Sequence, residues 1–374
     1  MSATWIELDL ALLKRNLSAV RQVLPRGAHL VFSVEGNAYG HGLAEVAPCA
    51  WFCGVKTFQA CGVEEAVDVR RLLPEARILV AGIADPGDIA AILEHRLTVV
   101  VVSEAHARAL SRGAAAQMAA VQVHAEIDTG MGLCGFDWQS SADTLGRLAR
   151  TPGLRIVGLC STFAASEAED GALAEVQVAR FRQAVEACRG AGVRAPMCYM
   201  ADAAAMLRNP GWIMDGARSG LLPYGYTPRV SNRPDVDCAP FLHWKARLAE
   251  VKEVAPGFAV GSGGAYLAGT RTRVGTVAAG YRDGVDPRIG GRGGVLVGGR
   301  LCPVIGAVEM NAMAVDLGPE GPHQAGDEVV LLGSQGGATL RADEMAAACG
   351  TTAAAVLTHI RAENRTALRG RRGW

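Results

Sequence analysis

The sequence has no excess of charge of either sign, because its 37 lysines and arginines equal its 37 aspartates and glutamates. A neutral chain offers little electrostatic attraction to nucleic acid or to an anionic membrane surface. The sequence also lacks any apolar run near the roughly 18 residues that a membrane-spanning helix needs. We therefore expect neither nucleic acid nor a membrane as a partner.

Paired cysteine and histidine motifs are missing as well. None of the ten cysteines stands in a CxxC pair, and the eight histidines show no HxxxH or HxH spacing. This pattern predicts reduced, buried thiols rather than a disulfide framework, and no metal site. The first residues lack the charged and apolar regions of a secretory signal. We expect a cytoplasmic protein.

What the sequence does contain is a long alternation of β-rich runs and helical patterns. Several apolar runs are continuous, which is typical of strands buried on both faces. These runs are residues 31–34, 77–81, 97–102, 121–127, 155–159 and 196–200. Helical segments such as residues 63–72 and 175–181 lie between them. The alternation predicts an α/β fold with a TIM-like (β/α)8 barrel over residues 1–235.

The pattern changes in the last third of the chain. Short strands separated by glycine-rich turns are expected near residues 245–251, 274–278, 294–298, 303–306 and 328–332. Helical segments at 342–348 and 351–361 follow. We predict a mostly-β domain over residues 236–374 that ends in short helices.

Five motifs, in order along the chain, resemble the alanine racemases, which are pyridoxal phosphate (PLP) enzymes of fold type III. The first is VEGNAYGHG at residues 34–42, and the second is EIDTGMG at 126–132. The others are RSGLLPYG at 218–225, AGYRDG at 279–284 and PVIGAVEM at 303–310. The resemblance implies the barrel and β domain predicted above, and a homodimer in which the β domain of one subunit completes the barrel site of the other.

The residues that carry the family's chemistry differ from the family pattern. The resemblance aligns Glu35 with the lysine that binds PLP as an imine, and a carboxylate cannot form that bond. It aligns Ser262 with the tyrosine that acts as the second base. Donors to the cofactor phosphate are replaced by Ala203, beside the new charge of Asp202, and by Ala354. These changes lead us to expect no cofactor, neither covalent PLP nor PLP bound by contacts alone.

Other positions of the family's site keep a polar or matching residue. Arg218 is retained and is the candidate partner for the Glu35 carboxylate, because a buried unpaired charge is unfavourable. Glu126 stands where the family has a lysine. Leu133 stands where the family has the arginine that accompanies that lysine. Thr162 replaces a histidine near the pyridine ring. We predict substrate contacts at Arg218, Glu126, Thr162, Tyr281 and Met310.

The leading hypothesis is a repurposed, PLP-independent enzyme, unable to racemise by the two-base mechanism, that acts on a small anionic or amino-acid-like molecule. Its catalytic residues would be Glu35 as acid or base, with Tyr39 and Ser262. One alternative is an inactive pseudoenzyme that acts as a ligand-binding or regulatory dimer. Another is a residual amino-acid enzyme that binds PLP without a covalent bond. The identity of the substrate and the type of reaction remain open at this point.

Overall fold

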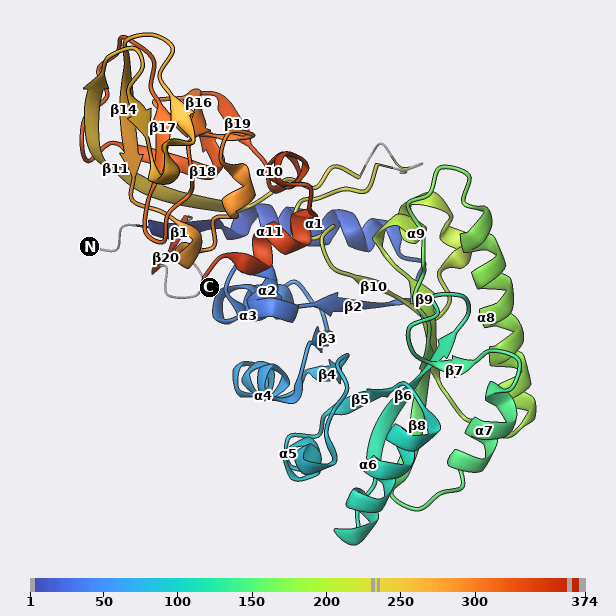
Figure 1. Cartoon of the computed structure of the whole chain (residues 1–374). Coiled ribbons are helices and arrows are strands. Elements are labelled where there is room, and N and C mark those ends of the chain that lie inside the picture. Colours follow the sequence, from blue (N-terminus) through green and yellow to red (C-terminus); the bar gives the residue numbers. More distant parts are fainter. Residues whose placement is uncertain (1–3, 230–232, 234–235, 362–364, 370–374) are drawn as a thin grey trace. The chain divides into compact units, whose positions relative to one another are not determined.

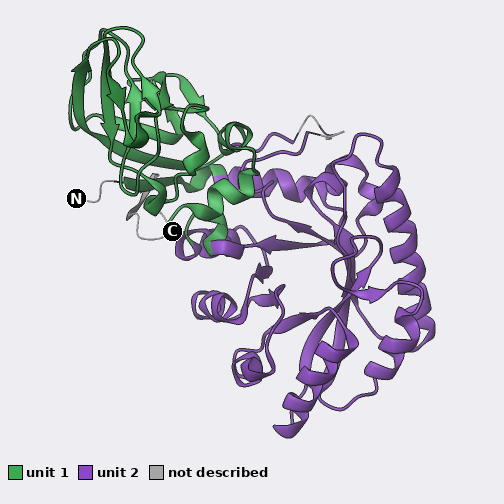
Figure 2. Cartoon of the chain, in the orientation of Figure 1, with its two compact units in different colours: residues 1–12, 37–42, 240–374 green, residues 13–36, 43–239 purple. Residues whose placement is uncertain are grey.

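The computed structural model describes residues 4–229, 233, 236–361 and 365–369 (Figure 1). The chain divides into two compact units (Figure 2). One unit comprises residues 13–36 and 43–239, and the other comprises residues 1–12, 37–42 and 240–374. We call them the barrel unit and the β unit. The predicted domain boundary at residue 235 lies outside the described residues and stays a prediction.

The barrel unit contains a closed barrel of eight parallel strands. The strands follow each other round the barrel in chain order, and β10 pairs with β2 to close it. They are β2 (His29–Ser33), β3 (Thr57–Ala60), β4 (Arg77–Val80), β5 (Thr98–Val101), β6 (Val121–Asp128), β8 (Leu154–Cys160), β9 (Met197–Ala201) and β10 (Gly216–Ser219). A short strand, β7 (Phe136–Asp137), pairs with the end of β6. The predicted (β/α)8 barrel is confirmed.

Helices lie outside the barrel strands; the first precedes β2, and the others connect successive strands (Figure 1). They are α1 (Leu10–Val23), α3 (Leu43–Phe52), α4 (Val63–Leu72), α5 (Ile89–Glu94), α6 (Glu104–Ala116), α7 (Ser141–Leu148), α8 (Ala172–Gly190) and α9 (Ala203–Arg208). The helix predicted at residues 63–72 coincides with α4. Its glutamates lie in the first turn and its arginines in the last, which favours the helix dipole.

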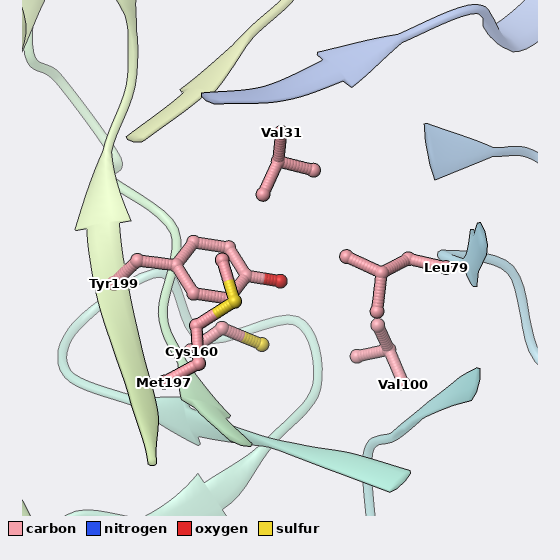
Figure 3. Packing of buried hydrophobic residues seen from close by; sticks show 6 residues of the cluster. All are labelled: Val31, Leu79, Val100, Cys160, Met197 and Tyr199. Atoms are coloured by element: carbon pink, nitrogen blue, oxygen red, sulfur yellow. The ribbon is translucent and has the colours of Figure 1, made fainter. Parts of the chain in front are cut away.

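Apolar side chains fill the middle of the barrel. Figure 3 shows six of them pointing toward one another from the surrounding strands: Val31, Leu79, Val100, Cys160, Met197 and Tyr199. All six are at most 8 % exposed. Because strand side chains alternate between the two faces, these residues identify which positions point inward. Some inward positions nearer the ends of the barrel are polar, among them Ser33 at the carboxyl end and His29 at the amino end.

The β unit is built on a nine-stranded sheet. Its strands are β1 (Thr4–Asp9), β11 (Leu242–Val254), β14 (Thr272–Val277), β15 (Gly294–Val297), β16 (Arg300–Ile305), β17 (Met313–Asp316), β18 (Glu328–Gln335), β19 (Ala338–Leu340) and β20 (Arg365–Arg369). A small hairpin, β12 (Ala259–Val260) with β13 (Tyr266–Leu267), and two helices, α10 (Ala342–Cys349) and α11 (Ala353–His359), complete it. The mostly-β domain is confirmed, and its sheet includes β1 from the start of the chain, which pairs with β11.

Candidate functional site

Polar side chains gather at the carboxyl ends of the barrel strands, where TIM barrels place their active sites. They lie at or just beyond the ends of β2, β3, β6, β8 and β10. We call this set the mouth cluster: Ser33, Glu35, Gln59, Glu126, Thr162 and Arg218. Three of its members, Glu126, Thr162 and Arg218, were predicted as substrate contacts and Glu35 as a catalyst. The structure brings all four to the same end of the barrel.

Glu35 is held by two neutral neighbours. Ser33 Oγ donates a hydrogen bond of 2.6 Å to Glu35 Oε2, and Gln59 Nε2 donates one of 3.0 Å to the same oxygen. The other carboxylate oxygen, Oε1, has no hydrogen-bond partner in the part of the chain that the structure describes. Gln59 Oε1 is buried and also lacks a partner there. The cluster therefore presents two unused acceptors close to Glu35.

The backbone beyond Glu35 forms an unusual turn, α2 (Glu35–Tyr39). Residues 36 to 39 all have positive φ, with values of 63°, 57°, 55° and 50°. Three of these residues carry side chains, for which the left-handed conformation costs roughly 1–2 kcal/mol each. Hydrogen bonds of 3.0 Å from His41 N to Ala38 O and from Gly42 N to Asn37 O hold the turn. Backbone strain of this kind concentrates at functional sites.

A second group in the cluster joins one cation to one anion through a hydroxyl. Arg218 Nη2 donates to Thr162 Oγ1 at 2.7 Å, and Thr162 Oγ1 donates to Glu126 Oε1 at 2.6 Å. Burial alone would lower the pKa of Arg218, but the acidic groups around it, among them the carboxylates of Glu126 and Glu35, outweigh burial and raise that pKa. The guanidinium therefore stays protonated. Glu126 thus finds its partner in Thr162, while Leu133 is exposed.

The predicted contact between Glu35 and Arg218 is wrong. No hydrogen bond or ion pair joins them within the described residues, and the two interact only as charges at longer range. The reason is local: β2 and β3 place Ser33 opposite Gln59, so both side chains reach Glu35 first. Sequence analysis missed Ser33 and Gln59. The alternation of β2 could have indicated Ser33, which points inward like Val31, whereas β3 was not recognised as a strand.

Beneath the mouth cluster the barrel interior is kept neutral. Burial lowers the pKa of His124 to about 4, and His124 Nδ1 lies 3.2 Å from Tyr199 Oη. Burial, together with the neighbouring Cys160, raises the pKa of Tyr199 well above its usual value. Both groups are therefore uncharged near neutral pH. Arg218, Glu35 and Glu126 are the charges that a ligand at this end of the barrel would meet first.

Asp202, the residue that accompanies Ala203, has a structural role. It caps α9, because its Oδ1 accepts a 2.9 Å hydrogen bond from Ala205 N. Its Oδ2 accepts a 2.6 Å bond from Ser166 Oγ. Both oxygens are thus engaged by the fold. The charge that we expected to oppose an anionic ligand is already satisfied by donors.

The remaining predicted site residues belong to the β unit. Tyr39 lies in the left-handed turn, and Ser262 is exposed, with its backbone N 3.3 Å from Glu309 Oε1. Tyr281 and Met310 expose 44 % and 52 % of their surfaces. That these β-unit residues share a site with the mouth cluster stays a prediction. Within the described residues, no helix could span a membrane and no group of three or more metal-binding side chains occurs.

All ten cysteines are free in the structure, and seven of them are buried. The buried thiols have pKa values raised by burial, to about 12 for Cys49 and about 11 for Cys198. The prediction of unpaired cysteines among small apolar residues is therefore confirmed. None of these thiols has the lowered pKa of a catalytic nucleophile.

Comparison with known proteins finds alanine racemases among the relatives of this chain. The chain is 33 % identical over 351 residues to the alanine racemase of Syntrophobacter fumaroxidans, covering 94 % of this chain and 93 % of that protein. It is 35 % identical over 356 residues to that of Treponema pallidum, covering 92 % and 93 %. The crystal structure of the Bacillus anthracis alanine racemase with bound L-Ala-P superposes with a TM-score of 0.92, at 28 % identity and covering 100 % and 96 %.

These relatives overturn two expectations. A repurposed enzyme unable to racemise is contradicted, because relatives that match almost the whole chain are alanine racemases. The expectation that the protein works without a cofactor is contradicted too, because the enzymes of this family depend on PLP. Both expectations gave single residues, above all Glu35, more weight than similarity along the entire chain.

The family models agree with this similarity in both units. The model of the alanine racemase N-terminal domain matches residues 8–228, and the model of the C-terminal domain matches residues 241–367. Together the two matches cover the barrel and the β-rich part of the chain. The protein belongs to the alanine racemase family.

Proposed function

We propose that this protein is an amino-acid racemase that acts on a small substrate of the alanine class. One observation carries the proposal: the mouth cluster places an unused carboxylate oxygen, Glu35 Oε1, at the same end of the barrel as the Arg218 guanidinium. A racemase needs a group that moves the α-proton and a group that holds the substrate carboxylate. The alanine racemases that match this chain support the substrate class.

Substrate recognition would use the cation of the cluster. Arg218 uses one nitrogen for Thr162 and has further N–H groups for a substrate carboxylate. Gln59 Oε1 lacks a partner among the described residues, but it is buried and its side chain is held by the hydrogen bond from Nε2 to Glu35, so it is not offered to the substrate. The carboxylate of an amino acid therefore matches Arg218.

The residues present do not fit a lysine imine with PLP. The sequence has four lysines, and none follows the carboxyl end of a barrel strand. Lys14 lies in α1, and Lys245 and Lys252 lie in β11. Lys56 precedes β3, at the amino end of that strand, and its Nζ lies 3.6 Å from the centroid of the Trp51 ring. PLP supplies an electron sink when bound, but no lysine of this chain is placed to hold it as an imine, and we derive no step through one.

Glu35 takes the acid–base role in this proposal. Ser33 and Gln59 hold its Oε2, which leaves Oε1 to remove a proton from the substrate α-carbon and to return it. Ser262 is the proposed hydroxyl on the opposite face of the substrate. A serine hydroxyl is a weak acid, so it would relay the proton between the substrate α-carbon and water, delivering it in one direction of the reaction and accepting it in the reverse direction. Tyr39 is kept as a proposed catalytic residue that donates a hydrogen bond to the substrate.

The roles of Ser262, Tyr281 and Met310 rest on a homodimer, in which one subunit brings them to the other subunit's mouth cluster. The exposure of Tyr281 and Met310 supports this part of the proposal. The free thiols support the proposed cytoplasmic location. Light scattering after size exclusion tests the dimer: a monomer at micromolar concentration would remove these three residues from the site.

The test of the function is exchange of the α-proton. L-alanine and D-alanine are each incubated with the protein in D2O, with and without added PLP, and followed by proton NMR. We expect loss of the α-proton signal and appearance of the opposite enantiomer when PLP is present. Absence of both exchange and inversion, in protein shown to be folded and dimeric, would refute the proposal.

A further inference from the structure

The opposite end of the barrel, at the amino ends of its strands, has a cavity of about 340 Å³. It is lined by the first residues of several strands, whose side chains form a polar ring. The ring consists of His29, Thr57, Arg77, Thr98, Gln122 and Arg155. Leu79, His124 and Met197, from the barrel interior, form its floor. All of these residues belong to the barrel unit, and none belongs to the mouth cluster.

The charge of this cavity is one-sided. Two guanidiniums, those of Arg77 and Arg155, face it, and no aspartate or glutamate lines it. A neighbouring cavity of about 330 Å³ shares His29 and Thr57 and adds three more cations, again without a carboxylate. These are Arg21, Arg26 and Lys56. A chain with equal numbers of acidic and basic residues thus gathers five cations around two adjoining cavities.

Donors in this cavity are left without partners. The side chains of Arg77 and Arg155 make no hydrogen bond or ion pair with any described residue. Thr57 is only 3 % exposed, and its hydroxyl has no hydrogen-bond partner among the described residues either. The Thr57 hydroxyl and the two guanidiniums are therefore available as donors to a bound anion or to water.

His124 adds a neutral donor at the floor. Its ring is 5 % exposed, and with Nδ1 beside Tyr199 Oη its Nε2 has no partner in the described part of the chain. Room for the ring comes from Gly158, where a Cβ would lie 2.6 Å from the imidazole. We assign the proton to Nε2, with Tyr199 donating to Nδ1; in this tautomer Nε2 can donate to an acceptor. Every unused group named here can then donate a hydrogen bond.

We propose that this cavity is a second binding site, for a small dianion such as a phosphate-bearing molecule or a short dicarboxylate. Arg77 and Arg155 bind the two charges from opposite sides of the ring. Thr57 and the Nε2 of His124 donate to the buried oxygens. The site is separate from the mouth cluster, and it does not depend on the proposed racemase activity.

The proposal is tested by calorimetric titration of the full-length protein with inorganic phosphate and, separately, with succinate, in a buffer of monovalent ions. We expect saturable binding that weakens as sodium chloride is added. Arg77→Gln and Arg155→Gln should each weaken binding about tenfold, as loss of a charged hydrogen bond predicts. Thr57→Val, which keeps the side-chain shape, should weaken binding several-fold.

Arg150→Gln is the matched control. Arg150 is also an exposed arginine of the barrel unit that makes no side-chain hydrogen bond with a described residue, but it lines neither cavity. Binding unchanged in this variant and lost in the Arg77→Gln/Arg155→Gln double variant supports the site. Binding of neither anion at millimolar concentration, or equal binding by wild type and double variant with native circular dichroism, would overturn it.

Discussion

At the carboxyl end of the barrel Glu35, Glu126 and Arg218 each hydrogen-bond to a neutral side chain, whereas at the amino end Arg77 and Arg155 have no partner among the described residues. The two ends share the same strands and the same apolar core between them. The difference lies in preorganisation. The groups proposed to move protons are held in one geometry, while the groups proposed to attract an anion can stay unpaired until it arrives.

The largest effect is expected from removing the proposed base. Glu35→Gln keeps the size of the side chain, but the amide has no basic oxygen for the α-proton. We expect α-proton exchange of alanine to fall by about 10²–10⁴-fold, the usual contribution of a general base. NMR exchange rates in D2O measure it. The matched control is Glu126→Gln at the other carboxylate of the cluster, which should retain much more activity. Equal losses of activity in both variants would contradict the assignment of Glu35, rather than Glu126, as the base.

The buried histidine between the two ends predicts a pH-dependent stability. The pKa of His124 is about 4 in the fold and about 6.5 when unfolded. The unfolded chain therefore binds more protons than the folded chain between these two pH values. The contribution of His124 to the free energy of unfolding is fully present above about pH 6.5 and is lost as the pH drops toward 4. The slope from this residue approaches about 1.4 kcal/mol per pH unit.

Urea unfolding of wild type and His124→Gln between pH 5 and 7.5 measures that contribution. The variant should lose stability less steeply as the pH falls. His41, whose pKa burial also lowers to about 4, remains in both proteins and supplies a common background. Identical slopes for the two proteins would mean that His124 is protonated in the fold.

A smaller loss of stability is expected from adding a methyl group at Gly158, next to the His124 ring. Gly158→Ala adds a Cβ within 2.6 Å of the imidazole, so ring or backbone must move. Overpacking of a core costs roughly 1–3 kcal/mol. Thermal unfolding measures the loss, and phosphate titration shows whether the amino-end site is disturbed as well. Gly190→Ala, where nothing lies within 4 Å of the new Cβ, is the control. Unchanged stability in Gly158→Ala would contradict the packing described here.

The smallest effect concerns the link between Arg218 and Glu126. Thr162→Val removes the hydroxyl that joins them and leaves both charges in place. We expect a loss of about 1–2 kcal/mol in unfolding free energy. The KM for alanine should rise with little change in kcat, because Arg218 would hold the substrate less firmly. A fall in kcat alone would assign Thr162 to the chemistry instead.

The fold was predictable where one property dominated. Continuous apolar runs identified strands such as β5 and β9, and glutamates followed by arginines marked α4. Two barrel strands escaped because their residues are mixed: β3 reads TFQA and β10 reads GARS. Both are strands because their neighbours in the barrel pair with them. Such pairing is not encoded in a four-residue run.

The sequence predicted which residues lie at the site, but it did not predict which of them contact each other. Glu35, Glu126, Thr162 and Arg218 do share one end of the barrel, because each follows or ends a parallel strand. The partners of Glu35 depend on β3, which was missed, so the expected contact with Arg218 was wrong. The choice of activity failed for another reason: a few substituted residues, Glu35 and Ser262 above all, were read as a change of function, although nearly the whole chain matches racemases.

The central claim is that the Glu35 carboxylate is the acid–base group of the mouth cluster and that no lysine forms an imine with PLP. Borohydride reduction of the PLP-saturated protein, followed by mass spectrometry of its peptides, tests this claim directly, with Glu35→Lys as the positive control. The account predicts no pyridoxyl group on the wild-type protein and a pyridoxyl group on residue 35 of the variant. A pyridoxyl group on any lysine of the active wild-type protein would contradict it.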